Sequence, residues 1–231
     1  MNLETSDDVN IHVLYLPNEQ TDVLTLYFHG NGGNIHQRSE VLEYIRSLGS
    51  GVIGVSYRGY LNSDGTPSEK GIYKDARAAL EYATDTLGYA KENIVLLGRS
   101  LGSGVAIELA QNNNFAGVVL VTPFSNPRDM LREQNWIMRL LVKNSNNYLD
   151  TAFQNSEKVK FITSFVLVVH GTADEVVPYA QGKQLYDAVP GDKLLVTING
   201  AQHNNFGFSD SSDFDKQYWT AIAELLKRIQ K

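Results

Sequence analysis

Short apolar runs separated by helix-length segments are the feature that most limits how this chain can fold. Six such runs recur along the sequence: Val23–Phe28, Val52–Ser56, Ile94–Gly98, Gly117–Val121, Phe165–His170 and Leu194–Ile198. Nearly continuous apolar runs of this length are typical of parallel strands that are buried on both faces. The segments between them predict helices at Ile35–Leu48, Ser68–Thr86, Leu101–Gln111, Tyr179–Ala188 and Asp213–Ile229. The sequence therefore predicts an α/β fold with a mostly parallel sheet and helices on both faces.

Composition narrows the class of protein further. The chain has 231 residues and no Pro/Gly/Ser-rich linker, so we expect residues 1–231 to form one domain. His12–Leu16 predicts an antiparallel edge strand that ends at Pro17. The net charge of −6 without a basic run argues against a nucleic-acid partner. The sequence has no cysteine, signal peptide or apolar run of the roughly 20 residues that cross a bilayer, and we expect a cytoplasmic protein.

The pentapeptide Gly98-Arg99-Ser100-Leu101-Gly102 carries the strongest chemical signal. It has the pattern G-x-S-x-G, follows an apolar run and opens a predicted helix. A serine on such a strand-to-helix corner is the nucleophile of many hydrolases, and the flanking glycines let the backbone pass close to its neighbours. Free N–H groups at the helix start can stabilise an oxyanion beside the serine. The pattern predicts Ser100 as a nucleophile.

A serine nucleophile needs a histidine base, and five histidines are available. We expect His12 and His36 on the surface, and His29 and His170 packed or hydrogen-bonded at strand ends. His203 differs because it lies in a polar loop between the last predicted strand and the last predicted helix. That loop leaves the same carboxyl edge of the sheet as Ser100, where sites of α/β sheets form. His203 is therefore the predicted base.

The acid that orients the base is expected after the strand Phe165–His170. Asp174 lies there at the same carboxyl edge and is the first candidate, although it could instead cap the following helix. Glu175 and the more distant Asp150 remain alternatives. With Asp174 as the acid, the chain order is serine, acid, histidine, which is the order found in α/β hydrolases.

The oxyanion hole and the substrate contacts complete the predicted site. His29–Asn34 is a glycine-rich loop after the first parallel strand, and its spacing does not fit a phosphate-binding loop. We expect the backbone N–H groups of Asn31 and Leu101 to receive the oxyanion. Residues 125–160 interrupt the strand–helix rhythm and predict a small helical cap that contains an amphipathic helix over Asp129–Val142, with packing of that helix onto the sheet edge as the alternative. In the cap interpretation, Trp136 and Met138 contact the substrate.

The chain resembles the α/β-hydrolase superfamily along nearly its whole length, and within it the serine-aminopeptidase-like branch that includes protein depalmitoylases and other acyl hydrolases. Six ordered segments carry the resemblance: His29–Asn34, Tyr57–Tyr60, Pro67–Glu69, Gly98–Gly102, His170–Asp174 and the turn through His203 and Asn204. Two departures stand out. Leu61 replaces a glycine that often continues the second segment, and the apolar anchor that members often carry at the N-terminus is missing. Membrane association is expected only where such an anchor precedes this sequence.

These residues together predict a serine hydrolase that cleaves esters or thioesters through an acyl-enzyme. Ser100, Asp174 and His203 form its triad, and neither a cofactor nor a metal is implied. A dehalogenase is disfavoured because that type, by resemblance, has an aspartate in place of Ser100. A peptidase with the same triad and a non-catalytic protein that keeps the fold for binding remain alternatives. The substrate's acyl length and the oligomeric state stay open.

Overall fold

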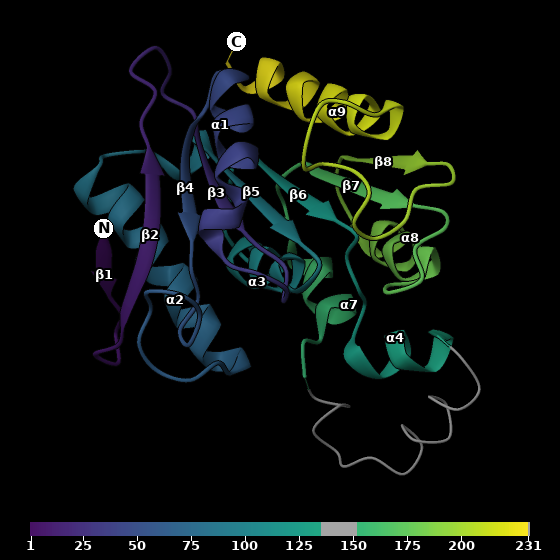
Figure 1. The fold of residues 1–231 in the computed structure, drawn as a ribbon, viewed down its shortest axis with the longest axis horizontal. Coiled ribbons are helices and arrows are strands. Elements are labelled where there is room, and N and C mark those ends of the chain that lie inside the picture. The colour runs from purple at the N-terminus through teal and green to yellow at the C-terminus, as the bar shows by residue number, and fades with distance from the viewer. Residues whose placement is uncertain (135–151, 231) are drawn as a thin grey trace.

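The computed structural model describes residues 1–134 and 152–230, which build an eight-stranded sheet with helices on both sides (Figure 1). The strands lie in the order β1-β2-β4-β3-β5-β6-β7-β8. Their bounds are β1 Asn2–Glu4, β2 Asn10–Leu16, β3 Leu24–Phe28, β4 Gly51–Val55, β5 Ile94–Arg99, β6 Gly117–Val121, β7 Val166–Gly171 and β8 Lys193–Ile198. β3 to β8 run parallel to one another, whereas β1 and β2 are antiparallel to their neighbours. The predicted α/β fold with a mostly parallel sheet is confirmed.

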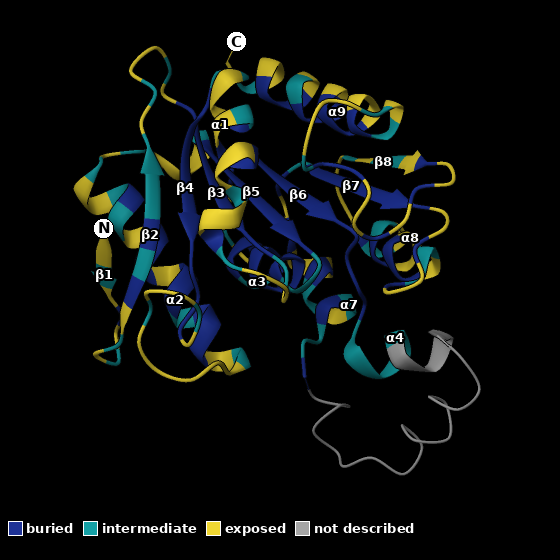
Figure 2. Cartoon of the chain, viewed as in Figure 1, coloured by how far each residue is buried: buried dark blue, intermediate teal, exposed yellow. Residues whose placement is uncertain are grey.

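Two helical layers cover the sheet and bury β3 to β7 on both faces, whereas β1, β2 and β8 keep exposed or half-buried residues (Figure 2). One layer consists of α1 (Ser39–Ser47) and α9 (Asp213–Ile229), and the other contains α2 (Glu69–Glu81), α3 (Leu101–Ala110) and α8 (Tyr179–Ala188). Successive residues of β5 belong to opposite cores: Ile94 and Leu96 pack toward α2 and α3, and Val95 and Leu97 toward α1 and α9. A strand between two helical layers has no solvent face, which explains the continuous apolar runs of β3 to β7. The run Leu194–Ile198 differs from this expectation, because it lies in the edge strand β8 and leaves Leu194 exposed.

The helix boundaries follow the sequence signals closely. α8 and α9 begin and end at the predicted residues. The helix predicted over Ser68–Thr86 consists of α2 and a π-helical turn at Tyr82–Thr86, and the Ser68 hydroxyl caps it by accepting a hydrogen bond from the Gly71 N–H. The helix predicted over Ile35–Leu48 begins with a 3₁₀ turn at Ile35–Arg38 before α1. A short 3₁₀ turn at Lys91–Asn93 precedes β5.

The N-terminal edge differs from the prediction. β2 is not the edge strand, because Asn2–Glu4 pairs with Asn10–His12 and takes that place. Three residues are too short to show a hydrophobic period, so the sequence carried no signal for β1. His12, which we expected on the surface, lies opposite Asn2 of this strand, is half-buried, and stacks on the exposed His36 with 5.1 Å between ring centroids.

The predicted cap is described only in part. α4 spans Pro127–Gln134, and α7 (Asn155–Lys158) and a 3₁₀ turn at Val159–Phe161 lead into β7. Trp136, Met138 and Asp150 lie outside the described residues, so their predicted roles stay predictions. The division into one domain with an inserted cap also stays a prediction. Within the described ranges, none of the helices combines the length and apolar character that a membrane span requires.

Candidate active site

Ser100 lies on the turn between β5 and α3, at the carboxyl edge of the sheet. Its backbone has φ 51° and ψ −115°, a left-handed conformation that costs a non-glycine residue about 1–3 kcal/mol. The Ser100 N–H donates to the carbonyl of Val121 on the neighbouring strand, with 2.9 Å between N and O. The sheet therefore holds the strained turn in place and keeps the Ser100 hydroxyl at the start of α3.

The two glycines of the pentapeptide are required by close backbone packing. A Cβ on Gly98 would meet the carbonyl of Gly102, and a Cβ on Gly102 would meet the carbonyl of Phe28 at the end of β3. Neither backbone group can give way without moving a strand or a helix. The spacing read from the sequence thus has a steric cause, which is the close approach of α3 to β3 and β5.

His203 and Asp174 lie beside Ser100 in the arrangement that the sequence predicts. His203 Nε2 is 3.2 Å from Ser100 Oγ, and His203 Nδ1 is 2.7 Å from Asp174 Oδ2. Because a carboxylate only accepts, Nδ1 carries the proton and Nε2 is left to accept from the serine hydroxyl. Loops after β5, β7 and β8 supply the three side chains, and the parallel sheet brings those loops to one edge.

Asp174 is held in place by several donors. Its Oδ1 accepts hydrogen bonds from the N–H groups of Val176 and Val177, at 2.9 and 2.8 Å. Burial by itself raises the pKa of Asp174, but the hydrogen bonds from His170 and His203 outweigh it and hold the pKa well below its usual range. Glu175 is exposed to solvent. The carboxylate that faces His203 is therefore that of Asp174.

The other two histidines at strand ends are packed, as predicted. His170 is fully buried, and its Nε2 donates to the Val177 carbonyl at 2.9 Å and lies 3.4 Å from Asp174 Oδ2. His29 is fully buried between the aromatic rings of Tyr57 and Tyr60, and burial lowers its pKa to about 4. Neither ring reaches Ser100, so neither competes with His203 as the base.

The loop after β3 lies against the nucleophile. A Cβ on Gly30 would be 3.4 Å from Ser100 Cβ, which shows how close the loop comes. Within the described part of the chain, the N–H groups of Asn31 and Leu101 donate to no other backbone or side-chain atom. Their role as oxyanion donors stays a prediction, and both groups are free to fill it.

Three residues that support the site were not identified from the sequence. The Tyr60 hydroxyl donates to Asn31 at 2.8 Å, and the Tyr57 hydroxyl donates to the His29 carbonyl at 3.0 Å, so both hold the loop after β3. Arg99, the second residue of the pentapeptide, donates to the His203 carbonyl through Nη2. The tyrosines stand in the segment Tyr57–Tyr60 of the family resemblance, which gave them no role.

A cavity of about 580 Å³ opens at Ser100. Ten described residues line it: Gly30, Asn31, Gly32, Arg38, Arg99, Ser100, Val176, His203, Asn204 and Phe208. Its volume suits a small or drug-sized ligand. Among the described residues, no group of three or more His, Asp and Glu side chains is placed to hold a metal ion.

Comparison with known proteins agrees with this geometry at the level of the family and fold. A family profile described as the alpha/beta hydrolase fold matches residues 25–165. The chain is 29% identical to an uncharacterized protein of Acanthamoeba polyphaga mimivirus, over 96% of this chain and 79% of that protein. It is 32% identical to the alpha/beta hydrolase domain-containing protein aho-3 of Caenorhabditis elegans and 31% identical to protein 17C of the same description from Mus musculus. These two matches cover 82% and 78% of this chain and about half the length of each animal protein.

Solved structures of low sequence identity share the fold. The Pyrococcus furiosus esterase Pf2001 superposes with a TM-score of 0.78 at 18% identity, over 99% of this chain and 91% of that one. The esterase RhEst1 from a Rhodococcus species superposes with a TM-score of 0.72 at 18% identity, over 99% and 98%. With its sheet order, its serine corner and this profile match, the chain belongs to the alpha/beta hydrolase fold family.

Proposed function

We propose that this protein is a serine hydrolase that cleaves carboxylic esters or thioesters through an acyl-enzyme. The observation that carries the proposal is the pair of hydrogen bonds that links Ser100 through His203 to Asp174. Two of the fold neighbours are named esterases, which makes ester cleavage the first reaction to assay.

The mechanism assigns one role to each group. His203 Nε2 takes the proton as Ser100 Oγ attacks the substrate carbonyl, and the N–H groups of Asn31 and Leu101 receive the oxyanion. His203 then protonates the leaving alcohol or thiol, and a water molecule activated by the same nitrogen releases the acid from the acyl-serine. Asp174 holds the imidazole tautomer and stabilises the imidazolium formed in both steps. Its lowered pKa keeps the carboxylate charged throughout.

A fluorophosphonate probe tests whether Ser100 is an activated nucleophile. The wild-type protein is expected to be labelled at Ser100, and Ser100→Ala is expected to lose both labelling and esterase turnover. Removing the nucleophile of a serine enzyme costs on the order of 10⁶ in kcat. A folded, unlabelled wild-type protein would favour the alternative of a non-catalytic binding protein. A Ser100→Ala variant that kept more than a few per cent of activity would refute the nucleophile assignment.

A substrate panel separates ester from peptide chemistry. We would compare p-nitrophenyl esters from acetyl to palmitoyl, one acyl-thioester and a matched p-nitroanilide. Hydrolysis of the esters and thioester without the anilide is the expected result. Anilide turnover comparable to that of the esters would favour the peptidase alternative.

A further inference from the structure

The cavity at Ser100 is lined by positive charge and by no negative charge among the described residues. Its two charged side chains are Arg38 and Arg99, although the whole chain carries a net charge of −6. The triad carboxylate of Asp174 lies behind His203 and does not line the cavity. A cationic cavity in an acidic protein favours anionic molecules.

Arg99 is a buried cation without a carboxylate partner. Only 5% of its surface is exposed, and it forms no ion pair with a described carboxylate, although the charge of Asp174 stabilises it from a longer distance. Nη2 donates to the His203 carbonyl, whereas Nε and Nη1 donate to no described atom. Burial lowers the pKa of Arg99, which reflects how unfavourable the buried charge is. A charge in this position needs a compensating group, and within the described residues Arg99 finds one carbonyl and two aromatic rings but no ion-pair partner.

Arg38 approaches one of the aromatic rings that Arg99 contacts, that of Phe208. Its guanidinium carbon is 5.0 Å from the centre of the Phe208 ring, and that of Arg99 is 4.3 Å from the same centre. Arg38 donates to the Gly32 carbonyl at 3.1 Å and forms no ion pair with a described carboxylate. Cation–π contact offsets part of the cost of each charge, but it does not relieve the repulsion between the two.

We propose that Arg38 and Arg99 form a subsite for an anionic group of the substrate, a carboxylate or phosphate located near the scissile bond. This inference rests on the proposed function and narrows its substrate class to esters or thioesters that carry a negative charge. Planar guanidinium groups match the oxygens of carboxylates and phosphates, and both arginines line the cavity into which Ser100 opens. An anion bound there neutralises two charges that form no ion pair with any described carboxylate.

A purely structural role for the arginines accounts for less. The bond from Arg99 to the His203 carbonyl needs one N–H donor, which a neutral glutamine also supplies. Arg38 contacts neither Ser100, His203 nor Asp174 through any hydrogen bond in the described chain. One neutral donor would be enough for the bond to the His203 carbonyl. The anion subsite explains why the cavity has two charged side chains instead.

The test uses two matched substrate pairs that differ only in charge. The first pair places the anion on the acyl side, as the mono-4-nitrophenyl ester of adipic acid and its terminal amide. The second places it on the leaving group, as 4-acetoxybenzoate and 4-acetoxybenzamide. For each protein variant we would measure the ratio of kcat/KM for the anionic member to that for the amide. Comparing this ratio between variants cancels the intrinsic reactivity of the two esters.

In at least one pair, Arg38→Gln and Arg99→Gln are each expected to lower the wild-type ratio roughly ten-fold or more, as loss of a charged hydrogen bond would. Arg38→Lys keeps the charge and should retain part of the ratio. Arg46→Gln, on the exposed face of α1, is the matched control and should leave the ratio at the wild-type value. A change confined to one pair assigns the anion to the acyl side or to the leaving group.

Two results would overturn the subsite, and they differ in what else they overturn. If wild-type protein cleaves both pairs and the ratio is the same in Arg38→Gln as in wild type, the subsite is refuted and the serine hydrolase stands. If no ester is cleaved and the fluorophosphonate does not label Ser100, the proposed function is refuted as well. Should Arg99→Gln fail to fold by circular dichroism, the Arg38 variants decide the matter alone.

Discussion

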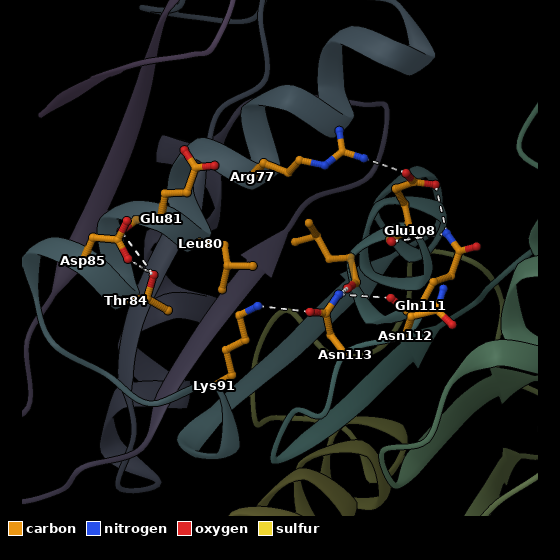
Figure 3. A pocket seen from close by; sticks show the side chains of 11 residues that line it. Arg77, Leu80, Glu81, Thr84, Asp85, Lys91, Glu108, Gln111, Asn112 and Asn113 are labelled. Atoms are coloured by element: carbon orange, nitrogen blue, oxygen red, sulfur yellow. Dashed lines mark hydrogen bonds and ion pairs between the residues drawn. The ribbon is translucent and has the colours of Figure 1, made fainter.

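Two cavities of nearly equal volume differ in almost every other respect. The cavity at Ser100 has about 580 Å³, and a second cavity between α2 and α3 has about 560 Å³ (Figure 3). In the second cavity, the two basic side chains have partners within the protein: Arg77 pairs with Glu108 at 2.7 Å, and Lys91 donates to Asn113 at 3.0 Å. In the first, Arg38 and Arg99 have no described carboxylate partner, and Ser100 has a strained backbone.

The elements that line each cavity explain why their charged side chains are paired differently. Two helices that follow one another along one face of the sheet, with the turns beside them, line the second cavity. Loops from four separate strands meet in the first, at the carboxyl edge where parallel α/β sheets bind ligands. Volume alone therefore does not identify a site here. A positive φ does not identify it either, because Asn112 in the second cavity has one as Ser100 does in the first. A buried guanidinium without an ion-pair partner, which costs folding free energy, distinguishes the cavity in which chemistry is proposed.

Among the tests of this comparison, the largest effect is expected for Asp174, the proposed acid behind the first cavity. Asp174→Asn keeps the shape of the side chain but loses the charge that stabilises the imidazolium, and kcat should fall by about 10⁴ with little change in KM. Glu175→Gln, on the exposed neighbour, is the matched control and should be nearly silent. Steady-state kinetics on the best short-chain ester, with thermal melts of both variants, make the measurement. If Glu175→Gln lost activity and Asp174→Asn kept it, the catalytic acid would be Glu175.

The next largest effect is a loss of stability when Gly102, at the start of α3 next to Ser100, is replaced. Gly102→Ala forces a methyl group against the Phe28 carbonyl and should lower the free energy of unfolding by about 3 kcal/mol, as overpacking of a rigid core does. Gly32→Ala, in the same cavity, places its methyl group in open space and should change stability by less than about 0.5 kcal/mol. Urea unfolding compares the two. Equal costs would show that α3 can shift and that the corner is not rigid.

His29, the first residue of the loop after β3, should make the protein sensitive to acid. Its pKa of about 4 in the folded state is below the ordinary value of 6.5, so the unfolded state binds the proton first and stability falls as the pH drops. Between pH 7.5 and pH 5.0 the loss should be about 2 kcal/mol. His29→Gln should remove that part of the pH dependence, and the same substitution at the exposed His36 gives the control. Urea unfolding of the variants at both pH values decides.

The smallest effect is expected in the second cavity. Arg77→Gln removes a partly exposed ion pair, but Glu108 keeps Lys158 at 2.7 Å, so the unfolding free energy should change by about 1 kcal/mol or less. Ester turnover should equal that of the wild-type protein. A loss of turnover without a loss of stability would break the contrast between the two cavities and make the second one a functional site.

Local patterns were enough to predict most of the fold and the residues proposed for catalysis. Continuous apolar runs between helix-length segments indicated the strands. The glycines at 98 and 102 indicated a corner at which a Cβ would meet backbone atoms. The order of elements then places Ser100, Asp174 and His203 at one edge without any knowledge of side-chain contacts. β1 could not be predicted in this way, because a strand of three residues is too short to show a hydrophobic pattern.

The sequence by itself determined the strands, the helices and the edge at which their loops meet, because each of these follows from periodicity and chain order. Only the tertiary structure decided which of the adjacent carboxylates faces His203, since that depends on the path of the backbone after β7. It also decided that Arg99 reaches the carbonyl of a residue 104 positions away, and that Arg38 and Arg99 share the ring of Phe208. Such contacts are set by side-chain directions across distant segments, and no local pattern records them because the residues become neighbours only when the sheet forms.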